Sequence, residues 1–163
     1  MASDVVLREQ LLALLDGGNA HMDIEAAVAD FPESAMNQCP PNVTYTPWHI
    51  LEHIRRTQKD ILEFVRDPLY VSPPWPAGYW PKPDEQATSE KWEETLQGIR
   101  EDLNAFEAIL KDEHVDITAE LPHAPGYTLL REALLIADHS AYHLGEFAIL
   151  RQVMGTWPSD RRS

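Results

Sequence analysis

The prolines of this chain fall in clusters, and the clusters limit where a helix can run. Residues 31–46 and residues 67–88 hold most of the 13 prolines, and a shorter Pro/Gly connection covers residues 121–126. Proline lacks an amide hydrogen and its ring clashes with the preceding helical turn, so these segments cannot form regular helix. The sequence is therefore divided into helical stretches that are joined by irregular ones.

Between the proline-rich segments, apolar residues recur at the helical period. The expected helices run to about Leu15, from Thr46 and Pro47 to before Pro68, from the N-cap Ser89 to about Lys111, and from Thr128 to about Met154, where Gly155 suits the C-terminus. No segment alternates clearly enough to predict a strand. The pattern predicts an all-α protein, a four-helix bundle that forms a single domain over residues 1–163.

The composition fits a globular domain and argues against several classes of protein. Of the 163 residues, 44% are hydrophobic, which is enough to form a core. The formal net charge is −14 and the basic residues are scattered, so we expect no nucleic-acid partner. No stretch approaches the ~20 apolar residues that span a bilayer. With a single cysteine, Cys39, and no visible secretory signal, we expect a cytoplasmic protein.

Two pairs of histidines, each spaced i,i+4, are the pattern with the most chemical content. His49 and His53 lie on the second expected helix, and His139 and His143 lie on the fourth. This spacing places both rings of a pair on one face of a helix, one turn apart. On the second helix, His53 falls at the edge of the apolar stripe and His49 falls further round. We therefore expect His53 to point inward and His49 to point more toward solvent.

The fourth expected helix contributes the other two imidazoles. One apolar face is expected to consist of Leu130, Leu134, Ala137, Ala141 and Ala148. His139 and His143 lie nearly opposite this face, among further apolar residues, and a helix that is apolar on most sides is usually buried on most sides. Three imidazoles, from His53, His139 and His143, would suit a divalent metal such as Zn²⁺, Ni²⁺ or Fe²⁺ and leave positions for water or substrate.

Two features near these histidines have more than one interpretation. Glu146, one turn past His143, is a fourth ligand, a partner that holds a ligand in place, or a general base, and we take it as the candidate catalytic proton acceptor. The segment of residues 67–88 carries Trp75, Tyr79 and Trp80. It is either a lid over the site or simple packing against the bundle or a dimer face.

Two stretches of the sequence resemble the DinB/YfiT-like superfamily. They are Thr46-Pro47-Trp48-His49-Ile50-Leu51-Glu52-His53-Ile54 and Asp138-His139-Ser140-Ala141-Tyr142-His143-Leu144-Gly145-Glu146. The resemblance covers essentially the whole chain and implies an up-down-down-up connection of the four helices. It also implies a divalent metal held by His53, His139 and His143, with His49 not a ligand. Similar sequences often have Gln at position 146, so Glu146 is a departure from the pattern.

The resemblance supports a metal site better than it supports a particular reaction. The superfamily includes thiol-cofactor-dependent transferases and isomerases, and metal-dependent hydrolases are suspected. Our first hypothesis is a metal-dependent hydrolase or thiol-dependent transferase that acts on a small-molecule substrate through Lewis-acid activation. The alternative is a non-catalytic, stress-related binding or dimerisation bundle whose metal is structural or absent. Because members of the superfamily are often dimers, we expect a homodimer.

Overall fold

The computed structural model describes residues 2–159 and is mostly helical, with four main helices packed together. The main helices are α1 (Ala2–Asp16), α3 (Pro47–Arg66), α4 (Ser89–Lys111) and α5 (Leu129–Met154). Shorter elements are α2 (Ile24–Val28), the 3₁₀ turn η1 (Glu33–Ala35), and the strands β1 (Glu120–Leu121) and β2 (Ala124–Thr128). The predicted all-α four-helix bundle is confirmed. No helix within the described part of the chain is long and apolar enough to cross a membrane.

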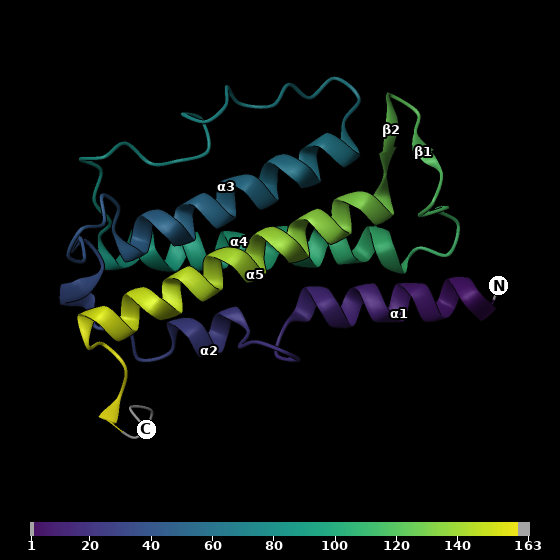
Figure 1. The fold of residues 1–163 in the computed structure, drawn as a ribbon. Coiled ribbons are helices and arrows are strands. Elements are labelled where there is room, and N and C mark those ends of the chain that lie inside the picture. The colour runs from purple at the N-terminus through teal and green to yellow at the C-terminus, as the bar shows by residue number, and fades with distance from the viewer. Residues whose placement is uncertain (1, 160–163) are drawn as a thin grey trace.

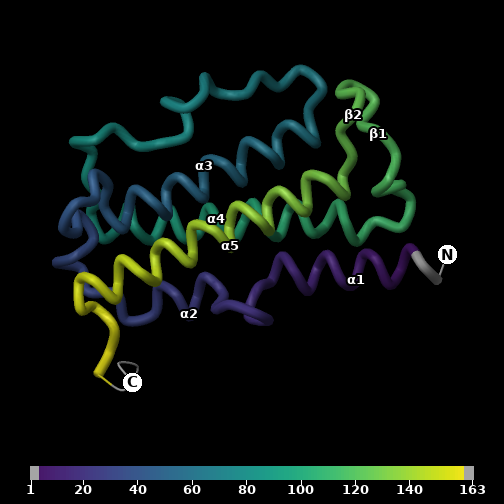
Figure 2. Tube along the Cα trace, in the orientation of Figure 1, coloured from purple at the N-terminus to yellow at the C-terminus, as the bar shows by residue number. Residues whose placement is uncertain are grey.

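The order and direction of the helices follow the predicted up-down-down-up connection. In Figure 1, α3 and α4 run in one direction, whereas α1 and α5 run in the other. Two consecutive helices that run in the same direction need a long return, and residues 67–88 provide it. The tube in Figure 2 shows this segment passing back along the outer side of α3 before α4 begins.

Threonine hydroxyls set the starts of the three helices that form the site and its support. The side chains of Thr46, Thr88 and Thr128 each accept a hydrogen bond from the backbone N–H three residues later, as N-caps do. Ser89, predicted as the cap of α4, is instead its first helical residue. The predicted end of α5 is confirmed, because Gly155 adopts a left-handed conformation with φ 65°.

The apolar core consists of two clusters, one around the N-terminal half of α3 and one around its C-terminal half. The first includes Trp48, Ile54, Phe147 and Leu150, and the second includes Leu62, Phe106, Leu129 and Ile136. The predicted apolar face of α5 is partly wrong, because Leu134 is 47% exposed. The buried face of α5 is instead the one that carries Ile136, His143, Phe147 and Leu150, with His139 half-buried.

A short antiparallel hairpin links α4 to α5, where no strand was predicted. Glu120 pairs with Thr128 and Leu121 pairs with Ala124, across an irregular register. The strands carry Pro125 and Gly126 and show no alternation of buried and exposed residues, so periodicity could not reveal them. His123 at the turn is 2.8 Å from the carbonyl of Phe64, which attaches the hairpin to the end of α3.

Candidate metal centre

Three imidazoles from two helices meet between α3 and α5. The Nε2 atom of His53 lies 3.1 Å from Nε2 of His143 and 3.0 Å from Nε2 of His139. His53 and His143 are buried, and His139 is half-buried. One ligand atom from each ring falls within 4.8 Å of the others, an arrangement that could hold a metal ion. The i,i+4 spacing on α5 brings two of the rings to one face, and α3 supplies the third from across the groove between the helices.

A main-chain carbonyl fixes the tautomer of His53. Its Nδ1 atom lies 3.0 Å from the carbonyl oxygen of Tyr79. A carbonyl oxygen only accepts hydrogen bonds, so the proton of the neutral ring is assigned to Nδ1. The Nε2 atom then carries a free lone pair, which points toward α5.

A carboxylate fixes His143 in the same way. Its Nδ1 atom lies 2.8 Å from Oε2 of Glu146, one turn further along α5. An ionised carboxylate is also an acceptor only, so Nδ1 of His143 carries the proton and its Nε2 carries a lone pair. The other carboxylate oxygen, Oε1, accepts a short hydrogen bond from the hydroxyl of Tyr45, in the loop before α3.

The two assigned tautomers leave a contact that a bound cation would satisfy. Nε2 of His53 and Nε2 of His143 face each other at 3.1 Å with a lone pair on each, and neither ring has a proton to place between them. Imidazole bonds to Zn²⁺ of 2.0–2.1 Å place neighbouring nitrogens of a tetrahedral site about 3.4 Å apart. The observed separations of 3.0 and 3.1 Å are within a few tenths of an ångström of that value, so the donor set fits a small divalent cation.

The surroundings also disfavour protonation of the rings. Burial, together with the neighbouring rings of His143 and His53, lowers the pKa of His139 to about 3. Burial likewise lowers the pKa of His53, although the hydrogen bond to the Tyr79 carbonyl opposes this effect. Neutral imidazole is the form that binds metals, so both shifts favour the ligating state at neutral pH.

His49 lies outside this cluster, but it does not point toward solvent as the sequence suggested. Its side chain is buried, with Nε2 placed 2.8 Å from the carbonyl of Glu85. Its Nδ1 atom accepts a longer bond, 3.4 Å, from the backbone N–H of Thr46 and completes the capping box of α3. Both ring nitrogens are thus engaged by the protein, which explains why His49 is not a member of the site.

The segment of residues 67–88 supplies one wall of the site. The indole of Trp80 stacks on the ring of His53 with 3.9 Å between centroids and 7° between planes. The hydroxyl of Tyr79 donates to Asp60 of α3 at 2.8 Å, and this bond fixes the backbone whose carbonyl orients His53. The segment is therefore packed on α3, while Trp75, 76% exposed, projects away from the protein.

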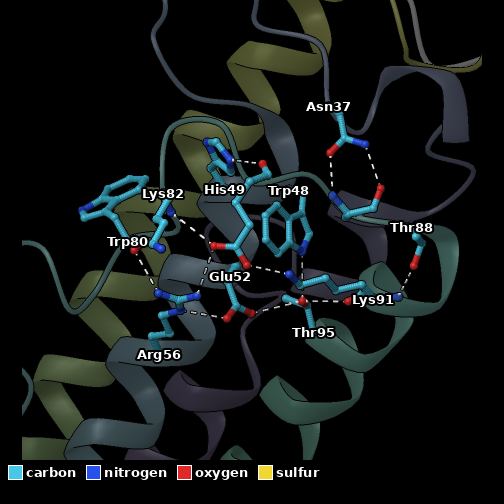
Figure 3. A network of polar contacts seen from close by, with 12 residues as sticks. Asn37, Trp48, His49, Glu52, Arg56, Trp80, Lys82, Thr88, Lys91 and Thr95 are labelled. Carbon is cyan, nitrogen blue, oxygen red and sulfur yellow. Dashed lines mark hydrogen bonds and ion pairs between the residues drawn. The ribbon is translucent and has the colours of Figure 1, made fainter.

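A partly buried ion-pair network around Glu52 holds this wall in place, and Figure 3 shows Glu52, Arg56 and Trp80 within it. Glu52 of α3, 4% exposed, accepts hydrogen bonds from Arg55 at 2.7 Å and from Arg56 at 2.8 Å. Arg56 also donates to the carbonyl of Trp80 at 2.9 Å. Burial acts to raise the pKa of Glu52, but the two guanidinium groups outweigh it and hold that pKa below its usual value. The charge on Glu52 is thus coupled to the position of Trp80.

The fold and the site define a class: an up-down-down-up helical bundle with a buried three-histidine cluster between its second and fourth main helices. A family model described as the DinB superfamily matches residues 18–147. The chain belongs to the DinB superfamily, which confirms the resemblance found in its sequence. Comparison with curated proteins and with solved structures gives no match.

The sequence patterns identified the three clustered histidines and placed Glu146 beside them. They missed Tyr45, whose hydroxyl binds Glu146, and the Tyr79 carbonyl that orients His53. Tyr45 directly precedes the N-cap Thr46, but nothing in the local sequence indicates that it reaches α5. The clustering of aromatic residues in residues 67–88 did draw attention to Trp80, without indicating that its ring covers His53.

Proposed function

We propose that this protein is a metal-dependent enzyme that binds a divalent metal through Nε2 of His53, His139 and His143. The proposal rests on the 3.1 Å contact between Nε2 of His53 and Nε2 of His143. Each ring has its Nδ1 atom beside a hydrogen-bond acceptor, so each Nε2 atom presents a lone pair to the other. A bound cation would replace this repulsion with coordination. It would also supply Lewis-acid activation to water or to a substrate thiolate.

A fourth protein ligand would have to come from Glu146, His49 or a loop residue, and the first two are engaged by other protein groups, which favours a catalytic over a structural metal. Glu146 uses one oxygen for His143 and the other for Tyr45, and His49 uses both ring nitrogens elsewhere. Structural zinc sites usually have four protein ligands, whereas catalytic sites have three and keep an open position. Three histidines with an open position support an enzyme that accepts a small molecule.

Two classes of reaction fit this arrangement, and we retain both: hydrolysis, and transfer to or from a thiol. Each needs a cation with an open position and a nucleophile that loses a proton. Our sequence-based assignment of Glu146 as the proton acceptor remains a proposal for either reaction. The second candidate function is a non-catalytic binding bundle. A coordination sphere that the protein closes completely would favour it.

Metal analysis of protein purified without a histidine tag tests the proposal. We expect about one equivalent of divalent metal in the wild-type protein and its loss in the triple variant His53→Ala, His139→Ala, His143→Ala. The matched control is His114→Ala, an exposed histidine between α4 and β1, which should retain the metal. A wild-type protein without stoichiometric metal that also fails to take it up on addition would refute the proposal.

We also propose that the protein acts as a homodimer on a small molecule in the cytoplasm, without a nucleic-acid partner. The net charge of −14 supports the last point, because phosphate backbones attract basic surfaces. Tyr142, Ile149 and Val153, exposed by 70%, 63% and 56% on α5, support association with a second copy. Sedimentation of the purified protein would show a dimer, and a concentration-independent monomer would contradict this part of the proposal.

A further inference from the structure

Two hydrogen bonds connect the histidine cluster to the loop before α3. The first joins Nδ1–H of His143 to Oε2 of Glu146, and the second joins the hydroxyl of Tyr45 to Oε1 of the same carboxylate. Tyr45 and Glu146 are 101 positions apart in the sequence, so only the tertiary structure brings them together. The carboxylate therefore has a partner on each oxygen, one from each side of the site.

We propose that Tyr45 is a positioning residue whose hydroxyl holds the Glu146 carboxylate against His143, so that Glu146 acts on the metal through this imidazole. This inference rests on the proposed metal-binding function and specifies the role of Glu146 within it. An anionic acceptor on Nδ1–H fixes the ring orientation of a ligating histidine and increases the electron-donating power of its Nε2. Tyr45 would thereby affect the metal without touching it.

The structure explains why Glu146 needs a second partner. Its side chain is 24% exposed, and a glutamate has several rotatable bonds, so one hydrogen bond alone competes with rotamers that lead into water. Tyr45 is itself well fixed: its ring packs 5.7 Å from that of Trp80, and the next residue is the N-cap of α3. The start of α3 thus determines where the hydroxyl lies, and the hydroxyl determines where the carboxylate lies.

The acceptors of the two buried histidines differ in charge, which makes the proposal specific. His53 donates to the neutral carbonyl of Tyr79, whereas His143 donates to a carboxylate. Only the His143 side therefore contains a charge that a side-chain substitution can remove. The variant Glu146→Gln removes the negative charge but keeps an acceptor that can orient the His143 ring. The glutamine oxygen can still accept the hydrogen bond from His143, while its amide hydrogens face the Tyr45 oxygen.

The experiment measures Co²⁺ affinity by competition with a chelator, together with the visible absorption spectrum of bound Co²⁺. Loss of an outer partner of a ligating histidine typically costs 10–100-fold in metal affinity. We expect Glu146→Ala to fall in about that range and Tyr45→Phe to weaken binding by roughly 3–10-fold, since the carboxylate remains but is less constrained. Glu146→Gln should bind more tightly than Glu146→Ala and still shift the Co²⁺ spectrum.

The control is Tyr127→Phe, which also loses one phenolic hydroxyl but lies on β2, outside the histidine cluster. The ring of Tyr127 packs on Phe64 with 5.2 Å between centroids, and its side chain is 40% exposed. This variant should bind Co²⁺ like the wild-type protein. A double variant, Tyr45→Phe with Glu146→Ala, should bind no more weakly than Glu146→Ala alone, because the hydroxyl then has no carboxylate to hold.

The outcomes separate this inference from the proposed function. If the wild-type protein and Tyr45→Phe bind Co²⁺ with equal affinity and identical spectra, the positioning role is refuted while metal binding stands. Additive effects in the double variant would refute it as well, because they would mean that Tyr45 and Glu146 act independently. If the wild-type protein binds no Co²⁺, the proposed function fails and the inference fails with it. Circular dichroism of each variant establishes that the compared proteins are folded.

Discussion

Replacing Glu52 with glutamine should destabilise the protein and loosen the wall of the histidine site. The carboxylate is 4% exposed and holds Arg55 and Arg56, whose side chains are 26% and 28% exposed. A hydrogen bond to a charged group contributes ~1.5–3 kcal/mol, and partial exposure of the arginines reduces this by about half. Two such partners give an expected loss of about 1.5–3 kcal/mol in the free energy of unfolding.

Thermal and urea unfolding measure this loss directly. For a domain of this size, 1 kcal/mol corresponds to ~2–4 °C, so the melting temperature of Glu52→Gln should fall by roughly 3–12 °C. Glu94→Gln, which changes an exposed carboxylate of α4, should stay within ~0.5 kcal/mol of the wild-type protein. Hydrogen exchange should also become faster around Trp80, because Arg56 loses the partner that aims it at the Trp80 carbonyl.

The pH dependence gives a second check on the same reasoning. The arginines hold the pKa of Glu52 in the folded protein below its ordinary value of 4.5. A lowered pKa means that the carboxylate stabilises the fold fully above that value and progressively less as the pH falls below it. The stability difference between the wild-type protein and Glu52→Gln should therefore shrink in acid. A difference under 0.5 kcal/mol at neutral pH, or one that persists unchanged in acid, would refute the argument.

Three further predictions concern the metal site and the tyrosines. A divalent cation at a hundred times its Kd should stabilise the wild-type fold by ~2.7 kcal/mol, measured by calorimetry. A chelator should reverse this stabilisation. The triple histidine variant should show no change in stability with either addition. Co²⁺ should quench tryptophan fluorescence less in Trp80→Phe than in Trp75→Phe, since Trp80 stacks on His53 and Trp75 is 76% exposed; equal quenching would contradict the site. Burial, followed by Glu146 and Asp60 respectively, raises the pKa of Tyr45 and Tyr70 to about 12. Stability should therefore fall as the pH rises from 10 toward 12, and tyrosinate absorbance of the folded protein should show these late titrations.

The sequence was sufficient for the helices and for the cluster of three histidines because both depend on local periodicity. Proline clusters bounded the helices, and Thr46 and Thr128 begin α3 and α5 as predicted, whereas Thr88 caps α4 in place of the predicted Ser89. The i,i+4 spacing placed His139 and His143 together whatever the tertiary structure. His53 followed because it lies next to the apolar stripe of α3.

The errors arose where tertiary contacts decide the outcome. His49 was expected near solvent because a helical wheel cannot show that residues 67–88 return over it and bury it against Glu85. Leu134 was expected in the core, but the packing of α5 depends on its neighbours and left that residue exposed. Tyr45 was missed because its partner Glu146 lies in the last helix. In each case the deciding group is distant in the sequence.

The two kinds of acceptor behind the histidines have a consequence for how such a site can diverge. The carbonyl that holds His53 belongs to the main chain of Tyr79, so a substitution at residue 79 keeps this acceptor atom and affects it only through the hydroxyl bond to Asp60 that fixes the backbone. The acceptor behind His143 is a side chain, and a single nucleotide change can alter its charge or remove it. One histidine thus keeps its acceptor atom whatever side chain stands at residue 79, while the acceptor of the other can be replaced outright. Substitution at position 146 alone would therefore change the charge beside the cluster while all three histidines are kept.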